Sequence, residues 1–429
     1  MTTETEKSYT LTGFIVWFIC ALFFLYEFLL RTIIGTFQHP IMYDLNLSSF
    51  KFSLLSTTFY LMIYGAMQIP VGLIVDRFGL KKSLFAGAII CSGSAIGFAE
   101  AHHFSTAMFF RMLTGLGSSF GFVCLLVSVY EWMPKKHIAL LIGVSQFIGT
   151  MGPMIAAGPV NAMANASTMT WRTIFYSLGV VGLLLTVAIL LLVKNSPRVQ
   201  GSYLVLRRPE KVKSNLIQLF SQWQPWVITL FSASIYFSIE FLSENDGKIF
   251  LNLKGFSSNL SSYMLTIAWI GYAIGCPLLG FLSDYLQRRK SIMVVSAFIA
   301  VAVMITIVYS NEKYALMSAF FFLGIAASGQ SVGFAVIAEQ FKKEYTAVGL
   351  ALNNAVITSV SSINAPIIGF TIDSIKTTEH PTLTDYQLVF NSLIAMSLLA
   401  LVLVLFFIKE TFCKSAVDYT YLNTDPKGA

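Results

Sequence analysis

The sequence predicts an all-α integral membrane protein, in which twelve transmembrane helices form two pseudo-symmetric six-helix bundles. Three observations lead to this fold class. The 429 residues are 56% hydrophobic and 11% charged, whereas an average soluble domain is about 45–50% apolar and about 25% charged. Long apolar runs recur along the whole chain. One long polar segment separates six of these runs from the other six.

Long apolar runs with few charges are typical of helices that cross a bilayer. The first run, from Leu11 to Phe37, is longer than the apolar core of a secretory signal, so we expect no cleavable signal peptide. The twelve expected spans cover residues 12–37, 50–75, 83–99, 104–131, 138–160, 171–193, 225–247, 258–282, 291–309, 314–339, 346–370 and 386–408.

The longest polar interruption begins at residue 194 with "KNSPRVQGSYLVLRRPEKVKSN" and carries many basic residues and two prolines. It predicts an N-terminal bundle over residues 1–193, a cytoplasmic basic linker over 194–224, a C-terminal bundle over 225–408 and a cytoplasmic tail over 409–429.

The basic residues follow the predicted topology. If the N-terminus is cytoplasmic, 20 of the 28 Lys and Arg residues lie in cytoplasmic segments and 6 in outer segments. This asymmetry is the positive-inside pattern. We therefore expect a multi-pass protein of the cell inner membrane with both termini in the cytoplasm. The net charge of +7 then reports orientation in the bilayer, and we expect no nucleic-acid partner.

The sequence gives little support to enzyme chemistry. The five cysteines lie in or beside apolar runs without disulfide or metal spacing, and the five histidines form no HxxxH or HExxH pattern. We find no G-x-x-x-x-G-K-[ST] motif for ATP and no nucleophile–base constellation within the spans. We expect no metal, no cofactor and no catalytic activity.

The two halves repeat weakly. At an offset of 208 residues, "GLIVDRFGLKK" (72–82) aligns with "GFLSDYLQRRK" (280–290), and Tyr64 aligns with Tyr272. The same offset matches Glu131 with Glu339, and an offset of 213 matches Glu27 with Glu240. Two parallel six-helix repeats are expected to carry their solute site at the repeat interface.

The segment 72–82 resembles the loop signature G-x-x-x-D-[RK]-x-G-x-[RK]-[RK] of the major facilitator superfamily. The segment "RMLTGLG" from Arg111 resembles the second motif of that family. More narrowly, "YEFLLRT" followed by "YGAMQIPVGLIVDRFG" resembles the phagosomal nutrient transporters of intracellular bacteria, which are believed to import amino acids or nucleosides. The resemblance implies solute transport by alternation of the two bundles.

The same resemblance implies a conformational latch at the two loop segments. Gly72 is expected to allow close approach of helices, and the basic residues can pair with the aspartate of the motif. A plain turn that only sets topology would explain the basic residues but not the glycine and aspartate at this spacing. The expected latch residues are Gly72, Asp76, Arg77, Gly79, Lys81, Asp284 and Arg288.

Glu27 and Arg31 stand one helical turn apart in the first span. A charge at the centre of a spanning helix costs roughly 2.5–3.5 kcal/mol, whereas an i,i+4 pair returns only about 0.2–0.5 kcal/mol. Both residues should therefore face a hydrated cavity or a partner. Arg31 can hold a carboxylate or phosphate of the solute, or snorkel toward the outer surface.

Glu27, Glu240 and Arg111 are the expected proton-coupling residues. Burial favours a protonated carboxyl and a neighbouring arginine favours an ionised one, so substrate and proton binding can be linked. A static ion pair between the first and seventh spans is the alternative. For Arg111, the family motif implies proton handling, and pairing with Glu27 or Glu240 is equally open. Glu244 and Asp246 are expected to be solvated at the outer mouth.

Uncharged polar residues suggest a lined path, although such residues also serve simply to hold helices together. Asn353, Asn354, Thr358 and Ser361 recur at nearly helical spacing, which predicts a polar stripe on the eleventh span. The expected substrate-binding residues are Arg31, Tyr64, Gln146, Tyr272, Gln330, Asn353 and Asn354.

Together these features predict a monomeric secondary transporter that imports a small polar nutrient, such as an amino acid, with protons. Its expected partners are the lipid bilayer, a small-molecule substrate and H⁺. An organic-anion transporter that uses Arg31 and a drug or siderophore exporter are the alternatives. A membrane sensor that binds but does not move its ligand is an alternative from a different class.

Overall fold

The computed structural model describes residues 10–134, 138–167, 169–195, 222–340, 346–375 and 381–413. The regular structure of this described part is helical, and it contains no strand. Within the described helices, the side chains of Ile69, Asp76 and residues 138–140, 167 and 346–348 lie outside the described part. So do most of the predicted linker, residues 196–221, and the tail beyond residue 413.

The first half forms a series of long helices joined by short turns. Thr10 begins the first of them, because its hydroxyl accepts a hydrogen bond from the Gly13 amide at 3.0 Å and so caps the helix. The elements are α1 (Leu11–Thr36), α2 (Gln38–Asp44), α3 (Ser49–Ser53), the π-helical turn η1 (Leu54–Thr58), α4 (Phe59–Phe78), α5 (Leu80–Ala99), α6 (Phe104–Trp132), α7 (Ile138–Ala157), α8 (Pro159–Ser167) and α9 (Trp171–Leu192).

The second half repeats this plan. A break at Ser328 divides the tenth predicted span, as Gly158 and Pro159 divide the fifth. The elements are α11 (Trp223–Glu244), α12 (Gly247–Leu253), α13 (Ser258–Leu286), α14 (Arg289–Tyr309), α15 (Lys313–Ala327), α16 (Gly329–Glu339), α17 (Thr346–Ile375), α18 (Leu383–Val402) and the π-helical turn η4 (Leu403–Phe407).

Eleven helices or helix pairs in the described part are long and apolar enough to cross a membrane. They correspond to eleven of the twelve predicted spans. The remaining span, predicted at 50–75, is the continuous helical stretch α3–η1–α4, which contains Ile69 and Asp76, whose side chains the structure does not describe. The seventh span ends earlier than predicted, at Glu244, because the chain turns there into the short helix α12.

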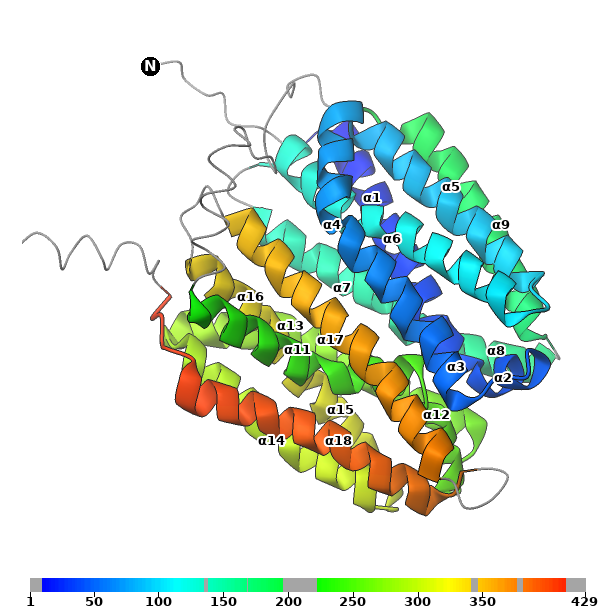
Figure 1. Cartoon of the computed structure of the whole chain (residues 1–429). Coiled ribbons are helices and arrows are strands. Elements are labelled where there is room, and N and C mark those ends of the chain that lie inside the picture. Colours follow the sequence, from blue (N-terminus) through cyan, green and yellow to red (C-terminus); the bar gives the residue numbers. More distant parts are fainter. Residues whose placement is uncertain are drawn as a thin grey trace, which may run out of the picture. The chain divides into compact units, whose positions relative to one another are not determined.

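The chain divides into two compact units. Unit 1 comprises Met1–Arg207 together with Ser243–Thr266 and Ala365–Ser374. Within it, α1 packs against α6 and α7, α5 packs against α6 and α9, and α4 packs against α6 (Figure 1). Its core includes Ile33, Phe37, Phe98 and Trp171. Unit 1 therefore combines the first six spans with the adjoining ends of α11, α13 and α17.

Unit 2 comprises Arg208–Leu242, Ile267–Asn364 and Ile375–Ala429. Within it, α14 packs against α15, α16 and α18 (Figure 1). Its core includes Ile228, Phe231, Met293 and Val336. The domain boundaries expected from the sequence remain a prediction.

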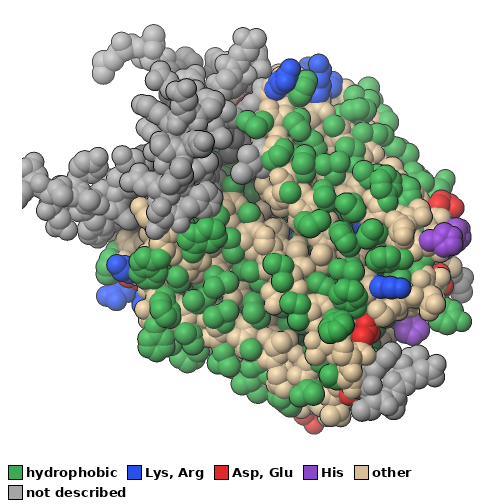
Figure 2. Space-filling model, viewed as in Figure 1, with side chains coloured by type: hydrophobic (Ala, Val, Ile, Leu, Met, Phe, Trp, Pro, Cys, Tyr) green, Lys and Arg blue, Asp and Glu red, His purple; other side chains and the backbone are tan. Residues whose placement is uncertain are grey.

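Large apolar side chains cover the outer faces of the helices. Leu191 is 73% exposed, Phe281 66% and Phe406 76%. Figure 2 shows hydrophobic side chains spread over the whole described part of the face in view. Many large apolar side chains on the outer faces of long apolar helices fit contact with lipid.

The internal repeat also has a backbone signature. Gly79 links α4 to α5 with a φ of 83°, and Gln287, its partner at the offset of 208 residues, links α13 to α14 with a φ of 52°. Both residues occupy the left-handed region, which non-glycine residues adopt rarely. The two loops therefore share a positive φ at this position, although only the first has a glycine there.

Candidate functional site

The apolar span α1 contains a buried ion pair. The Arg31 Nε atom lies 2.7 Å from Oε1 of Glu244, the last residue of α11. Arg31 is 9% exposed and Glu244 is 0% exposed. Arg31 therefore reaches a carboxylate rather than snorkelling to solvent. The expectation that Glu244 is solvated is wrong.

Close backbone packing explains this burial. A Cβ atom at Gly35 would lie 2.1 Å from the carbonyl oxygen of Ser243, so only glycine allows α1 and the end of α11 to approach this closely. Water is excluded from the contact, and the Glu244 carboxylate depends on Arg31 for its charge balance. Removing only one partner of such a buried ion pair strongly destabilises the folded protein, because the other charge is left buried without compensation.

Glu244, Asn245 and Asp246 form what we call the clasp segment. The Ser56 hydroxyl donates to Oδ1 of Asn245 at 2.6 Å, and the Asn245 amide donates to the Thr57 hydroxyl at 2.9 Å.

Gln38 donates to Oδ1 of Asp246 at 2.6 Å, and Asp246 is 1% exposed. The expectation that Asp246 is solvated is also wrong. Each residue of the clasp segment thus has a polar partner at the end of α1, at the start of α2 or in η1.

Glu27 lies one turn before Arg31 and is 3% exposed. The Tyr60 hydroxyl donates to Oε2 of Glu27 at 3.3 Å, and the Tyr60 ring stacks on that of Tyr64 with centroids 6.2 Å apart. Sequence reasoning missed Tyr60. Its position four residues before Tyr64, on the same face of one helix, was the available signal.

Arg111 is 1% exposed and joins three helical segments of unit 1. It donates to the backbone carbonyls of Leu30 at 3.0 Å and Arg31 at 3.3 Å in α1, and to those of Leu55 at 3.3 Å and Ser56 at 2.8 Å in η1. These partners are carbonyl groups, not the carboxylate of Glu27 or Glu240 that we considered. The π-helical turn makes this possible, because it disturbs the regular i to i−4 bonding of the helix.

Unit 2 contains a second set of polar contacts. Ser361 on α17 donates to Oε2 of Glu240, which is 1% exposed. The Tyr272 hydroxyl on α13 donates to Oε1 of Gln330 on α16 at 2.9 Å. The Tyr236 ring of α11 lies 5.7 Å from the Tyr272 ring. The predicted residues Tyr272 and Gln330 are therefore direct neighbours.

Asn353 on α17 is 0% exposed, and neither polar atom of its amide group has a hydrogen-bond partner among the described residues. A buried amide without partners costs about 1–3 kcal/mol, so it is retained where a ligand or water can satisfy it. Asn354 and Gln146 are partly buried, on α17 and α7. Gln146 and Asn354 are matched by the offset of 208 residues but belong to different units, so their facing each other across the repeat remains a prediction.

The loop motif of unit 1 is anchored to the end of α9. Oδ1 of Asn195 accepts the backbone N–H of Lys81 at 2.9 Å, and a Cβ at Gly79 would lie 3.1 Å from the same oxygen. Arg77 is exposed and lies over the Phe78 ring at 5.3 Å.

Among the described residues, no atom lies within 4 Å of a Cβ added at Gly72, and the expected close helix approach there remains a prediction. The predicted pairing of the Asp76 side chain lies outside the described residues.

In unit 2 the corresponding loop is held by Arg289 rather than by the predicted Arg288. Arg289 lies 2.6 Å from Asp284 and 3.0 Å from Glu339, and Arg288 is exposed. Arg289 is the repeat partner of Lys81, which is the sequence signal that we missed. Oε1 of Glu410 accepts the Arg289 backbone N–H at 2.8 Å, so the chain after α18 is joined to the same loop.

The described residues offer no group of three or more His, Cys, Asp or Glu side chains that could hold a metal ion. The buried charged side chains described above for unit 1 are those of Glu27, Arg31, Arg111, Glu244 and Asp246.

Comparisons with known proteins match almost the whole chain. The model of the Major Facilitator Superfamily matches residues 16–245 and 248–416. The hexuronate transporter of Bacillus subtilis (strain 168) is 26% identical over 252 residues, covering 58% of this chain and 59% of that protein. Vesicular glutamate transporter 3 of Danio rerio is 22% identical over 354 residues, covering 76% of this chain and 59% of that protein. The chain thus spans about 59% of the length of these two relatives.

A solved structure of a bacterial homolog of the human lysosomal transporter Spinster matches with a TM-score of 0.76 at 16% identity, covering 97% of this chain and 99% of that one. At this level of sequence identity, the similarity concerns the fold alone. The prediction of an all-helical membrane protein with two bundles is confirmed.

Proposed function

We propose that this chain, which belongs to the Major Facilitator Superfamily, imports a small organic carboxylate together with protons by alternating access. Transport by a multi-pass membrane protein follows from the family itself. The proposal itself concerns three further points: that the substrate is a carboxylate, that protons are the coupling ion, and that the direction of transport is import. The placement of both termini on the cytoplasmic side of the inner membrane, which the distribution of basic residues supports, is also proposed.

The observation that carries the proposal is the buried pair of Arg31 and Glu244. A guanidinium group binds carboxylates through two parallel N–H donors, so a substrate carboxylate can replace Glu244 as its partner. Hexuronate and glutamate, which give their names to the two relatives, both carry a carboxylate. An amino acid, the solute expected first from the sequence, shares this group and remains within the proposal.

Exchange of the Arg31 partner links binding to movement. When a substrate carboxylate takes the guanidinium, Glu244 loses its counter-ion, and the clasp segment loses one of its contacts with α1. A ligand can shift an equilibrium between two conformations only through such a difference in contacts. Substrate binding therefore favours release of the end of α11 from α1.

Glu27 provides the proposed proton site. It lies one turn from Arg31 in α1, is buried, and accepts a hydrogen bond from Tyr60. A substrate carboxylate adds a third negative charge, beside those of Glu27 and Glu244, around the single guanidinium of Arg31, so an ionised Glu27 becomes less favourable in this dry environment. Proton binding and substrate binding therefore favour each other, and this reciprocal coupling is what symport needs.

The remaining polar residues are proposed ligands for the uncharged part of the solute. In unit 2 the unpartnered amide of Asn353 can bind a hydroxyl or amine, and Tyr272 with Gln330 offers a second polar contact. In unit 1 Tyr64 and Gln146 stay candidates of the same kind. Glu240 and Arg111 keep only a proposed role in proton movement. The two loop segments around Gly79 and Asp284 are the proposed latch.

Uptake into proteoliposomes tests the proposal. Purified protein should accumulate radiolabelled D-glucuronate or L-glutamate when an inward proton gradient is imposed, and glucose should not compete. Competition by glucose but by no carboxylate would reject carboxylate transport. Binding of a carboxylate without accumulation would favour the sensor alternative. The narrower resemblance to phagosomal nutrient transporters gains support if amino acids are the better competitors.

The Glu27→Gln variant is expected to lose gradient-driven accumulation by at least tenfold, because glutamine keeps the size of the side chain but binds no proton. Exchange of labelled for unlabelled substrate across the membrane should persist, since exchange needs no net proton transfer. The exposed residue Glu312 supplies the matched control, Glu312→Gln, which should accumulate normally. Accumulation at the unmodified level in Glu27→Gln would remove the coupling role.

A further inference from the structure

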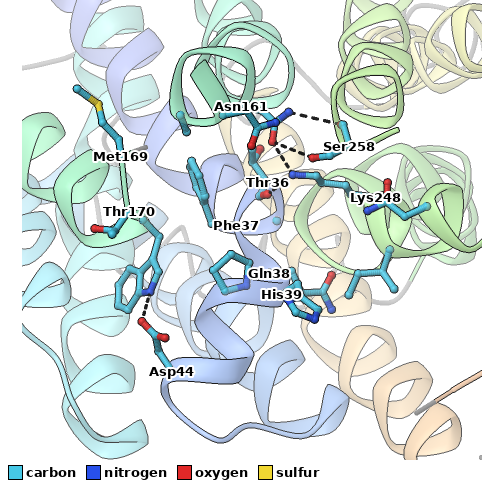
Figure 3. A pocket seen from close by; sticks show the side chains of 17 residues that line it. Thr36, Phe37, Gln38, His39, Asp44, Asn161, Met169, Thr170, Lys248 and Ser258 are labelled. Carbon is cyan, nitrogen blue, oxygen red and sulfur yellow. Dashed lines mark hydrogen bonds between the residues drawn. The ribbon is translucent and has the colours of Figure 1, made fainter. Parts of the chain in front are cut away.

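A cavity of about 420 Å³ lies in unit 1, where α1 ends and α2 begins. Its size falls within the range of about 300–1,000 Å³ that is typical of small-molecule pockets. Figure 3 shows the Lys248 side chain directed toward Asn161 and Thr36, while Asp44 lies on another wall. There Asp44 accepts a hydrogen bond from Trp171, which also lines the cavity. The cavity is thus lined by groups of both charges, from α1, α2, α8, α9, α12 and α13.

Lys248 lines this cavity and has no counter-ion among the described residues. Its ammonium donates to the Thr36 carbonyl at 2.9 Å and to Oδ1 of Asn161 at 2.5 Å. No carboxylate of the described part lies within ion-pair distance of it. Because burial removes water without supplying a negative charge, the pKa of Lys248 is lowered to about 8. An anion entering the cavity would supply that charge.

The negative charge in this cavity, the carboxylate of Asp44, already has partners. Oδ2 of Asp44 accepts the Trp171 indole N–H at 2.8 Å, and Nε of Arg172 lies 3.8 Å from the same oxygen. The cavity therefore favours an anion over a cation.

The amides on the wall of the cavity suit hydroxyl groups. Asn165 and Asn252 are exposed. Asn165 uses its amide N–H to donate to Asn259 at 2.7 Å, and Asn252 uses its carbonyl oxygen to accept from Ser261 at 2.8 Å. These bonds leave an acceptor on Asn165 and a donor on Asn252 for a ligand.

We propose that this cavity is a second binding site, in which Lys248 holds the carboxylate of a small hydroxylated acid while the asparagine amides bind its hydroxyl groups. The choice of a hydroxylated acid rests on the proposed transport of carboxylates. Thr36 lies five residues beyond Arg31, or about 7.5 Å along the helix axis. The site is therefore a waiting position next to the ion pair, and an anion there would compete for the bonds by which Lys248 ties α12 to α1 and α8.

Protection of lysines from chemical labelling tests the site without requiring transport. The purified full chain is treated with an amine-directed reagent at pH 8, with D-glucuronate or glucose present, and labelling is read for each lysine by mass spectrometry. Glucuronate should lower labelling of Lys248 at least fivefold and glucose should not. Lys254, which ends the same helix and does not line the cavity, is the internal reference and should label equally in both.

The double variant Arg31→Gln, Glu244→Gln separates this site from the ion pair. Protection of Lys248 should persist in it, because the cavity keeps all its lining residues. No protection in the unmodified protein would overturn the second site even if carboxylates are transported. Loss of protection in the double variant would also overturn it, by showing that the two positions are one. Protection without uptake of any carboxylate would keep the site and reject the proposed function.

Discussion

Arg31→Gln is expected to lower carboxylate uptake by at least 100-fold and also to destabilise the protein. Glutamine cannot bind a carboxylate through a charged fork, so the proposed substrate contact is lost. Glu244, which is 0% exposed, is left as a buried charge without its partner. Removing one member of a buried ion pair typically costs about 3–5 kcal/mol. Thermal unfolding in detergent and proteoliposome uptake measure the two effects separately.

The double variant Arg31→Gln, Glu244→Gln distinguishes the substrate role from a structural one. Two neutral amides can bond to each other, so the melting temperature should recover, whereas uptake should stay lost. Recovery of uptake together with stability would mean that Arg31 only balances Glu244. The milder change Arg31→Lys should weaken carboxylate binding by more than tenfold, because an ammonium lacks the planar fork. Lys51→Gln, at an exposed position on α3, is the control for lost positive charge.

Arg111→Lys is expected to destabilise unit 1 strongly. Arg111 donates to four backbone carbonyls on α1 and η1, and a lysine ammonium cannot span them. The loss of two charge-assisted hydrogen bonds at about 1.5 kcal/mol each gives roughly 3 kcal/mol. The measurement is the melting temperature in detergent. Arg77→Lys, at an exposed arginine of α4, should leave it unchanged.

The same variant also tests the proton role that the family motif implies for Arg111. A normal melting temperature combined with loss of gradient-driven uptake would support proton handling and contradict the structural role. A lowered melting temperature with uptake reduced only in proportion to folded protein would support the structural role alone.

The sequence was sufficient to predict the positions of the membrane spans and to detect the internal repeat. Apolar runs of membrane length depend on local composition, so the positions of helices such as α6 and α9 were predicted to within a few residues. The repeat could be read because Asp76 and Asp284 stand at matching positions in both loops. The buried polar residues Glu27 and Arg31 were found because ionisable groups are rare in such runs.

The partners of those residues could not be predicted. Arg31 meets Glu244 across more than two hundred residues of sequence, and this choice depends on the close approach at Gly35, which only the packed structure reveals. Glu244 and Asp246 were misjudged for the same reason: their place near the end of a span suggested water, whereas the turn into α12 buries them. Arg288 and Arg289 are adjacent basic residues, and only the backbone of the loop decides which one turns inward.

The π-helical turn η1 has a consequence for the whole of the helix that follows it. One residue more in a turn rotates everything downstream by about 100° around the helix axis. Tyr60 owes its orientation toward Glu27 to that rotation, and Tyr64 stacks on the Tyr60 ring. Deleting a single residue between Leu54 and Thr58 would restore regular helical winding and turn the Tyr60 and Tyr64 rings to another side of the helix. The extra residue in η1 therefore decides which aromatic side chain contacts the Glu27 carboxyl group.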